Sequence, residues 1–363
     1  MNNNLIEIIS KFVKVKNIAN ITKFDSGHIN DTYLIKTDDL KHSGFVLQKI
    51  NHNIFRNIEG LMNNIVLITD HLKSKFKDYS VEEIERKVLI FYKTTEGKFY
   101  YQDTNGNYWR CCKYIENSIT YDKIENELIA YKGGKIIGEF MNQLSDFDAN
   151  ILIETIPKFH DLEWRWENFE NSIAANLSKR VSNVPIEISV AKEKYPELVQ
   201  ITKLMKSGLL PLRVTHNDTK FNNILFSNEK EALCLIDLDT VMPGSLLHDF
   251  GDAIRTSCNT ADEDEKDLTK ISLNLTSFKH FTYGFLETAF GFITKSEKDL
   301  LVTSTKFMTF IMGLRFLTDY LDGDKYYKTN FSDHNLVRCR AQFKLLSSIE
   351  ENQEIMEQII KDA

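Results

Sequence analysis

The chain has 363 residues, 42% of them hydrophobic and 27% charged, which is ordinary for a soluble globular protein and long enough for about two domains. Its net charge of −7 excludes general nucleic-acid binding, so a nucleotide site would have to be a local basic pocket. The five cysteines have no CxxC spacing, which argues against structural zinc and for a reducing compartment.

The N-terminal residues predict a helix and no targeting signal. MNNNLIEIISKF lacks a basic region followed by an unbroken apolar run, and no stretch of the chain is apolar enough to span a bilayer. We therefore expect a cytoplasmic protein, with no membrane and no protein partner implied. Leu5, Ile8, Ile9 and Phe12 fall at helical spacing and predict an amphipathic helix against the first sheet.

Residues 20–50 have the pattern of strands joined by a turn. Residues 21–24 and 32–35 are apolar and β-prone, and the polar segment 25–31 between them reads as the turn of a hairpin. Residues 45–50 predict the next strand. Taken alone, the 25–31 turn is an ordinary hairpin with a single glycine.

The next segment adds one helix and two strands. Residues 54–73 show helical periodicity, and residues 88–99 and 107–114 read as strands around a turn at 103–106. Strand signals then stop and helical patterns begin. We therefore predict an antiparallel-sheet domain over residues 1–114 and a mostly helical domain over residues 115–363.

The C-terminal part predicts a series of helices. Close packing is indicated for residues 130–144 by Gly133, Gly134 and Gly138. Further helices are predicted over 154–169, over 172–207 with breaks at Pro185 and Pro196, over 300–321, and over 335–360.

The predicted helix 300–321 is apolar nearly all round, so we expect it to be buried. Arg315 and Asp319 lie four residues apart on one of its faces. A buried charged pair is costly unless satisfied, so these residues form either an internal ion pair or part of a polar pocket. Asp322, Tyr326 and Tyr327 would continue such a pocket.

The stretch 215–239, THNDTKFNNILFSNEKEALCLIDLD, has the residues that phosphoryl transfer requires. Asn223 follows Asp218 by five residues, and Asp237 follows it by nineteen, at the end of an apolar run. Phosphoryl transfer needs a carboxylate to accept a hydroxyl proton and oxygen ligands that hold Mg²⁺ against the phosphates. We assign Asp218 as the base and Asn223 and Asp237 as metal ligands. A plain polar loop is the alternative, and the IDLD segment at this spacing argues against it.

These motifs resemble a known superfamily. HNDTKFNN is similar to the catalytic-loop motif of the aminoglycoside phosphotransferases and choline kinases, and the resemblance covers nearly the whole chain. THNDTKFNNILF, ALCLIDLDTVMPG and DFGDAIR, with SGHINDTYLI early and GLRFLTDYLDGDKYYK late, more narrowly resemble bacterial N-acetylhexosamine 1-kinases. The resemblance implies an α+β, protein-kinase-like fold of two lobes that binds ATP and Mg²⁺.

Asp249, Phe250 and Gly251 spell DFG, the metal motif of protein kinases. In the superfamily resembled here, the metal-binding Asp stands closer to the base, where Asp237 fits. We therefore interpret Asp249 as a structural residue that braces the catalytic loop, and rank Asp239 below Asp237 as a ligand.

The resemblance also implies roles for further residues. The residues expected to contact the phosphates are Ser26, Gly27, Lys49 and Lys220. Gln48 is the alternative to Lys49, because neighbours on a strand face opposite ways. Whether Glu59 pairs with Lys49, as a helix Glu does in protein kinases, stays open. The residues expected to contact a sugar are His28, Asn30, Arg315, Asp319 and Tyr326.

The expected reaction is transfer of the ATP γ-phosphate to the anomeric hydroxyl of an N-acetylhexosamine. One alternative is a kinase of another small alcohol, such as an aminoglycoside, choline, ethanolamine or homoserine. A cationic substrate would require carboxylates and aromatic rings, which Asp319, Asp322 and the two tyrosines offer. The other alternative, an inactive nucleotide-binding scaffold, ranks last because Asp218, Asn223 and Asp237 are all present.

Overall fold

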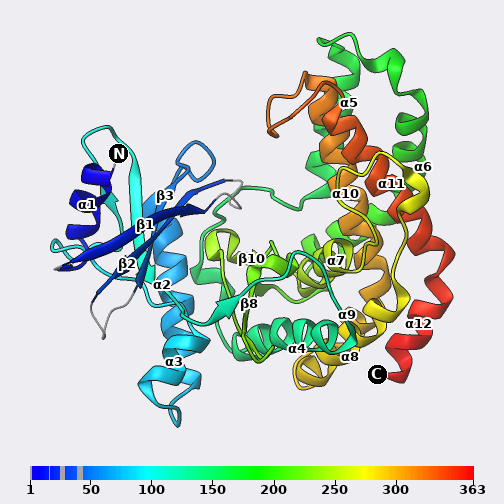
Figure 1. Ribbon diagram of the computed structural model, residues 1–363. Helices are drawn as coiled ribbons and strands as arrows, with labels where there is room; N and C mark the ends of the chain where they lie inside the picture. Colours follow the sequence, from blue (N-terminus) through cyan, green and yellow to red (C-terminus); the bar gives the residue numbers. More distant parts are fainter. Residues whose placement is uncertain (1, 16, 25–28, 39–43) are drawn as a thin grey trace. The chain divides into compact units, whose positions relative to one another are not determined.

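A computed structural model describes residues 2–15, 17–24, 29–38 and 44–363 (Figure 1). The chain forms two compact units, which we describe separately. Unit 1 comprises residues 1–119, 150–157 and 225–242, and unit 2 comprises residues 120–149, 158–224 and 243–363. An antiparallel sheet characterises the N-terminal part and helices the C-terminal part, which confirms the predicted α+β class. Residues 225–242 belong with the sheet, so the chain is not divided by a single boundary after residue 114; the functional roles of the two lobes stay a prediction.

The main sheet of unit 1 has five antiparallel strands. Their order across the sheet is β1 (Ile18–Phe24), β2 (Asp31–Thr37), β3 (Gly44–Ile50), β5 (Tyr108–Lys113) and β4 (Tyr101–Gln102). The predicted N-terminal helix is confirmed as α1 (Asn2–Ser10). Its apolar face packs on alternate residues of the sheet, among them Tyr33, Leu47 and Trp109. Because strand side chains alternate, this face of the sheet is the apolar one.

The predicted strand over residues 88–99 is wrong. Helix α3 (Val81–Lys87) precedes it, with a capping box formed by Ser80 and Glu83. Beyond α3, Phe91 makes only an isolated bridge to Cys112. A tight turn then follows, in which the amide of Gly97 donates to the carbonyl of Thr94 at 2.9 Å, and the chain pairs with β5 again only at β4.

Helix α2 (Ile58–Lys75) is tied to the segment that follows the predicted metal ligand Asp237. That segment continues a second sheet of β6 (Ser118–Ile119), β8 (Ile224–Ser227) and β9 (Ala232–Leu235), and leads into the short turn η4 (Leu238–Thr240). The buried amide of Asn64 on α2 donates to the carbonyls of Ile153, at 2.8 Å, and of Val241, at 3.0 Å. A polar group at the centre of α2 is thereby satisfied and holds the end of η4.

In unit 2, helices α4 (Glu127–Gln143) and α8 (Leu275–Ala289) cross at very short range. A Cβ on Gly134 would lie 1.9 Å from the carbonyl oxygen of Phe281, and one on Gly284 would lie 2.0 Å from that of Tyr131. Only glycine allows the two backbones to approach this closely. The close packing inferred from the glycines of the predicted helix 130–144 is confirmed.

Helix α10 (Leu301–Asp322) is the buried helix that the sequence predicts, and most of its residues are inaccessible. It packs mainly against four helices: α5 (Leu162–Ala175), α6 (Pro185–Lys206), α7 (Leu246–Ser257) and α11 (His334–Glu351). The remaining short elements are η1 (Ala149–Ile151), η2 (Val181–Asn183), β7 (Arg213–Thr215), η3 (Phe221–Asn223), β10 (Met242–Gly244), η5 (Leu268–Lys270), α9 (Lys295–Asp299) and α12 (Gln353–Asp362).

Three helix predictions need correction. Residues 154–161 are not helical, and α5 begins after Asp161, whose side chain accepts from the amide of Trp164. Pro196 lies inside α6 rather than at a break, whereas Pro185 occupies its first turn. The predicted helix 335–360 is interrupted at Asn352, whose side-chain amide donates to the carbonyl of Ser348 and competes with regular helix bonding.

No helix within the described residues has both the length and the apolar character required to cross a membrane.

Candidate functional site

The loop between β7 and η3 in unit 2 carries the predicted base, and Asp249 holds its backbone. The Asp249 carboxylate accepts from the amides of His216, at 2.7 Å, and Asn217, at 2.6 Å. The Thr219 hydroxyl donates to the carbonyl of Asp249 at 2.6 Å. Asn217 has a φ of +62°, a conformation that Asn tolerates better than most residues. These contacts confirm the interpretation of Asp249 as a residue that braces the loop.

Asp249 braces the loop from a buried position in the first turn of α7. Burial is the main cause that raises the pKa of Asp249 to about 7. The two amide hydrogen bonds lower this pKa, and the charges of Asp252 and Asp218 raise it further. The carboxylate that orders the loop therefore changes its protonation state near neutral pH.

Asp218, the predicted base, contacts both of its predicted neighbours in the loop. Its Oδ1 lies 2.9 Å from Lys220 Nζ, and its Oδ2 accepts from Asn223 Nδ2 at 3.0 Å. Burial tends to raise the pKa of Asp218, but the charge and hydrogen bond of Lys220, with His216 and Asn223, hold it below its ordinary value. Asp218 is therefore ionised at neutral pH, as a proton acceptor must be.

The amide of Asn223 is oriented by the base. Its Nδ2 also donates to the main-chain oxygen of Asp218 at 2.8 Å, so both of its described hydrogen bonds use the nitrogen. The Oδ1 atom is thereby left as an acceptor, which is the atom that a hard cation would bind.

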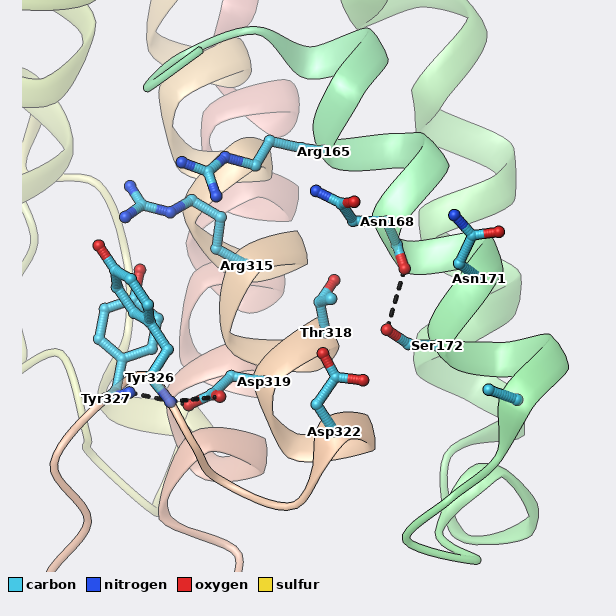
Figure 2. Close-up of a pocket in the computed structure, with 11 residues that line it drawn as sticks. Arg165, Asn168, Asn171, Ser172, Arg315, Thr318, Asp319, Asp322, Tyr326 and Tyr327 are labelled. Carbon is cyan, nitrogen blue, oxygen red and sulfur yellow. Dashed lines mark hydrogen bonds between the residues drawn. The ribbon is translucent and has the colours of Figure 1, made fainter. Parts of the chain in front are cut away.

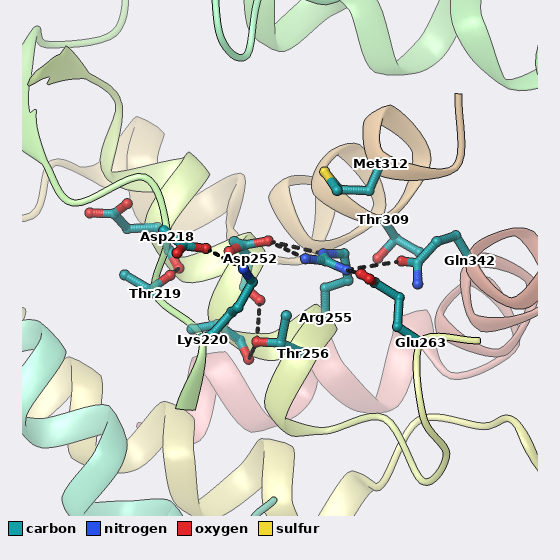
Figure 3. Close-up of polar contacts among 12 residues, drawn as sticks. Asp218, Thr219, Lys220, Asp252, Arg255, Thr256, Glu263, Thr309, Met312 and Gln342 are labelled. Atoms are coloured by element: carbon teal, nitrogen blue, oxygen red, sulfur yellow. Dashed lines mark hydrogen bonds and ion pairs between the residues drawn. The ribbon is translucent and has the colours of Figure 1, made fainter. Parts of the chain in front are cut away.

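Lys220 lies at one end of a charged chain in unit 2 (Figure 3). Arg255 forms ion pairs with Asp252 and Glu263, both at 2.8 Å. The charge of Asp218, and more weakly those of Asp252 and Glu263, raise the pKa of Lys220. Lys220 therefore remains a cation beside the base.

A cavity of about 410 Å³ in unit 2 brings the predicted residues Arg315, Asp319 and Tyr326 together (Figure 2). Its lining consists of Arg165, Asn168, Asn171, Ser172, Ala175, Arg315, Thr318, Asp319, Asp322, Tyr326 and Tyr327.

The alternative of an Arg315–Asp319 ion pair does not hold. Asp319 Oδ1 accepts from the amides of Lys325, at 2.9 Å, and Tyr326, at 2.8 Å, and Oδ2 accepts from that of Tyr327 at 2.9 Å. Asp319 thus anchors the loop that follows α10 and places the two tyrosines at the cavity.

Unit 1 holds a second cluster, around Asp239, two residues after the predicted metal ligand Asp237. Arg110, only 2% exposed, forms an ion pair with Asp239 and donates to Gln48 Oε1 at 2.9 Å. Asn30 Nδ2 donates to the other oxygen of Asp239 at 2.6 Å. Burial lowers the pKa of Arg110, but the carboxylates of Asp239 and Asp237 outweigh it and raise that pKa.

Lys49 lies apart from this cluster. It is paired with Trp109 in the sheet and shares a face with Leu47, whereas Gln48 and Arg110 belong to the opposite face. Lys49 and Glu59 form no ion pair with any residue of the described ranges, so the protein-kinase pairing is not present there. The predicted residues Ser26, Gly27 and His28 lie outside the described residues.

Sequence reasoning missed two arginines that the structure brings to these sites, Arg110 and Arg165. Arg110 stands in a strand, YWRCCK, in which every other interior residue is apolar. A charge at such a position is the one signal that could have drawn attention to it. Arg165 lies on a helix with exposed and buried polar residues, and its sequence context carries no comparable signal.

Comparison with known proteins agrees with this arrangement. Residues 20–270, more than half of the chain, match the family model described as "Phosphotransferase enzyme family". Among solved structures, the chain is similar to a microcompartment-associated aminopropanol kinase, with a TM-score of 0.64 and 12% identity over 98% of this chain and 99% of that one.

Two further structures share the fold at similarly low identity. A spectinomycin phosphotransferase in complex with ADP and spectinomycin has a TM-score of 0.59 and 14% identity, covering 97% of this chain and 98% of that one. A choline kinase from Cryptosporidium parvum has a TM-score of 0.59 and 13% identity, covering 99% and 98%. The predicted superfamily is confirmed: this chain belongs to the phosphotransferase enzyme family.

Proposed function

We propose that the protein is an ATP- and Mg²⁺-dependent kinase that phosphorylates the anomeric hydroxyl of an N-acetylhexosamine. The observation that carries the kinase chemistry is the Asp218 carboxylate, which is ionised, hydrogen-bonded by Asn223 and placed on a loop held by Asp249. The ADP complex of the similar spectinomycin phosphotransferase supports a nucleotide as the donor.

The residues present fit a Mg²⁺ ion. Asn223 offers its amide oxygen and Asp237 a carboxylate, and both are the hard oxygen donors that this ion prefers. When bound, Mg²⁺ would neutralise charge on the phosphates. Ser26, Gly27 and Lys220 would bind the phosphates. On β3 we propose Gln48 rather than Lys49 for this role, because Gln48 shares a face with Arg110, whereas Lys49 lies on the opposite face with Leu47.

The acceptor hydroxyl would donate its proton to Asp218 as its oxygen bonds to the γ-phosphorus, and the bond from that phosphorus to the bridging oxygen of the β-phosphate would break to release ADP. An anomeric hydroxyl is more acidic than an ordinary alcohol, so a carboxylate of low pKa suffices as the base. The sugar would occupy the cavity beside Arg315 and Tyr326, on the loop that Asp319 holds in place. His28 and Asn30 would contact the sugar or the phosphates.

One observation favours a different acceptor, an amine alcohol. Asp322 lines the cavity and makes no hydrogen bond or ion pair with the described residues, and Tyr326 is 55% exposed beside it. A carboxylate with an aromatic ring is suited to a cationic ligand. The similarity to aminopropanol and choline kinases fits this reading at the level of fold.

An ADP-release assay with ATP and Mg²⁺ separates the two readings. The panel contains N-acetylglucosamine, N-acetylgalactosamine, glucose, galactose, choline, ethanolamine, homoserine and kanamycin. Preferential turnover of the N-acetylated sugars, giving an acid-labile phosphate on C1, is the expected result. Turnover of an amine alcohol alone would keep the kinase and overturn the sugar acceptor.

A further inference from the structure

The cavity of unit 2 is lined by two arginines that form no ion pair with a carboxylate of the described residues. Arg315, on α10, is 7% exposed, and its one described hydrogen-bonding contact is with Met312 Sδ at 3.2 Å. Its guanidinium otherwise lies over aromatic rings, 4.9 Å from the centroid of Phe159 and 5.7 Å from that of Tyr327. A buried cation therefore faces the cavity with its N–H groups largely unused.

Arg165, on α5, lies at the same end of the cavity (Figure 2). Its Nε and Nη2 donate to one acceptor, the carbonyl of Phe159, at 3.3 and 3.0 Å, and its guanidinium stacks on Trp164. Within the described ranges, neither Arg165 nor Arg315 forms an ion pair.

Three other arginines of unit 2 form ion pairs with carboxylates, unlike Arg165 and Arg315. Arg213 is paired with Glu297, Arg255 with Asp252 and Glu263, and Arg180 with Asp324. Leaving a buried cation and a half-buried one together without a counter-charge is costly, because each loses hydration and repels the other. Arg338 also forms no ion pair with the described residues, so what distinguishes the cavity is that two such arginines line it together.

The described carboxylates nearest the pair are engaged elsewhere or lie apart from it. Burial, and next the charge of Arg315, lower the pKa of Arg165 to about 9, although Tyr327, Tyr326 and Asp161 act in the opposite direction. Asp161 is itself paired with Lys206, at 2.9 Å. Asp319 is satisfied by three main-chain amides and by Asn335. Asp322 lies at the other end of the cavity from the arginines (Figure 2).

Ring contacts within unit 2 connect the arginine pair with the helix that holds the catalytic loop. The Arg315 guanidinium lies 4.9 Å from the centroid of the Phe159 ring, and that ring lies 4.4 Å from the ring of His160. The His160 ring in turn lies 4.9 Å from that of His248, which precedes the loop-bracing Asp249 on α7. A short run of packed side chains therefore links the arginines to the residue that holds the loop.

We propose that the acceptor carries an anionic group, a carboxylate or a phosphate ester, which binds between Arg165 and Arg315. A guanidinium offers two parallel N–H donors that match either anion. The inference rests on the proposed sugar kinase and narrows its acceptor to an acidic sugar derivative.

Binding without ATP provides a readout that is separate from turnover. Calorimetry would compare N-acetylglucosamine with N-acetylmuramic acid, which adds a carboxylate, and with N-acetylglucosamine 6-phosphate. We expect one or both acidic sugars to bind about tenfold or more tightly than the neutral sugar, since a hydrogen bond between charged groups strengthens binding by about that factor. The two acidic probes distinguish a carboxylate from a phosphate.

Arg165→Met tests the site, and Arg340→Met is the matched control. Arg340 lies on α11 and is paired with Glu187, outside the cavity lining. Arg165→Met is expected to weaken binding of the acidic sugar about ten- to hundredfold, clearly more than it weakens binding of the neutral sugar, and to be partly rescued by Arg165→Lys. The control is expected to leave both affinities unchanged.

The outcomes separate the two proposals. If the neutral sugar is bound and phosphorylated as well as both acidic sugars, and Arg165→Met shows no charge-dependent effect, the sugar kinase stands and the anionic acceptor is overturned. If no sugar is bound or phosphorylated, the proposed function itself fails, and this inference with it.

Discussion

Lys220 Nζ lies 2.9 Å from Asp218 Oδ1, so the carboxylate proposed as the base has a cation as its immediate neighbour. The lysine side chain remains 41% exposed, and the negative charges around it raise its pKa. The pair keeps the proposed base ionised, with a cation beside it.

We expect kcat/KM to fall at acidic pH as Asp218 becomes protonated. Lys220→Met is expected to shift this fall to higher pH. In the native protein Lys220 lowers the pKa of Asp218, so the carboxylate form persists to a pH below its ordinary titration range. Without the lysine, burial remains as the main influence and raises that pKa. The pH dependence of kcat/KM, measured for both proteins, checks this; an acidic limb that does not move would contradict the coupling.

Asp218→Asn is expected to reduce turnover by a factor of about 10² to 10⁴, the usual contribution of a general base. An amide cannot take the acceptor proton, but its oxygen can still accept from Asn223 and preserve the loop. ADP release and nucleotide affinity would be measured together, and the affinity should remain nearly unchanged. Substantial residual turnover would show that another group is the base.

Asp249→Asn tests how the loop is held. The Asn side chain has one oxygen, which can accept from only one of the main-chain amides of His216 and Asn217, and it turns an N–H toward the other main-chain amide. We therefore expect the free energy of unfolding to fall by about 1–3 kcal/mol, and kcat to fall as well. The raised pKa of Asp249, about 7, means that the folded state retains a proton that the unfolded chain loses near pH 4.

The stability that Asp249 contributes therefore falls as pH rises from about 4 to about 7. The difference in unfolding free energy between wild type and Asp249→Asn should narrow over this window, and chemical denaturation at a series of pH values measures it. A difference that widens with pH would mean that the folded state favours the ionised form instead.

Arg110→Met is expected to destabilise the folded protein by about 3–5 kcal/mol, because the buried carboxylate of Asp239 would lose its counter-charge. The double variant Arg110→Met with Asp239→Leu should recover part of that loss. Lys113→Met is the matched control on the same strand, since its pair with Glu85 is partly exposed and is worth about 1 kcal/mol or less. Urea denaturation would give the free energy of unfolding of the wild type, the two single variants and the double variant. Equal losses of unfolding free energy for Arg110→Met and Lys113→Met would contradict a special role for the buried pair.

The sequence by itself determined the features that depend on short separations along the chain. The helical spacing of Leu5, Ile8 and Ile9 predicts α1, and the five-residue spacing of Asp218 and Asn223 places both in one loop, where they are hydrogen-bonded. Apolar periodicity likewise predicts that α10 is buried. Such patterns are readable because the local backbone geometry fixes which neighbours share a face.

Only the tertiary structure decided which distant charges meet. Arg110 and Asp239 are 129 residues apart and form a buried pair, and Arg165 on α5 meets Arg315 on α10 at one cavity. It also decided that Asp319 holds main-chain amides rather than Arg315, and that the face of β3 that carries Leu47 is the one packed against α1. These outcomes depend on strand register and helix packing, which are set by the whole core and leave no mark on the spacing of the residues concerned.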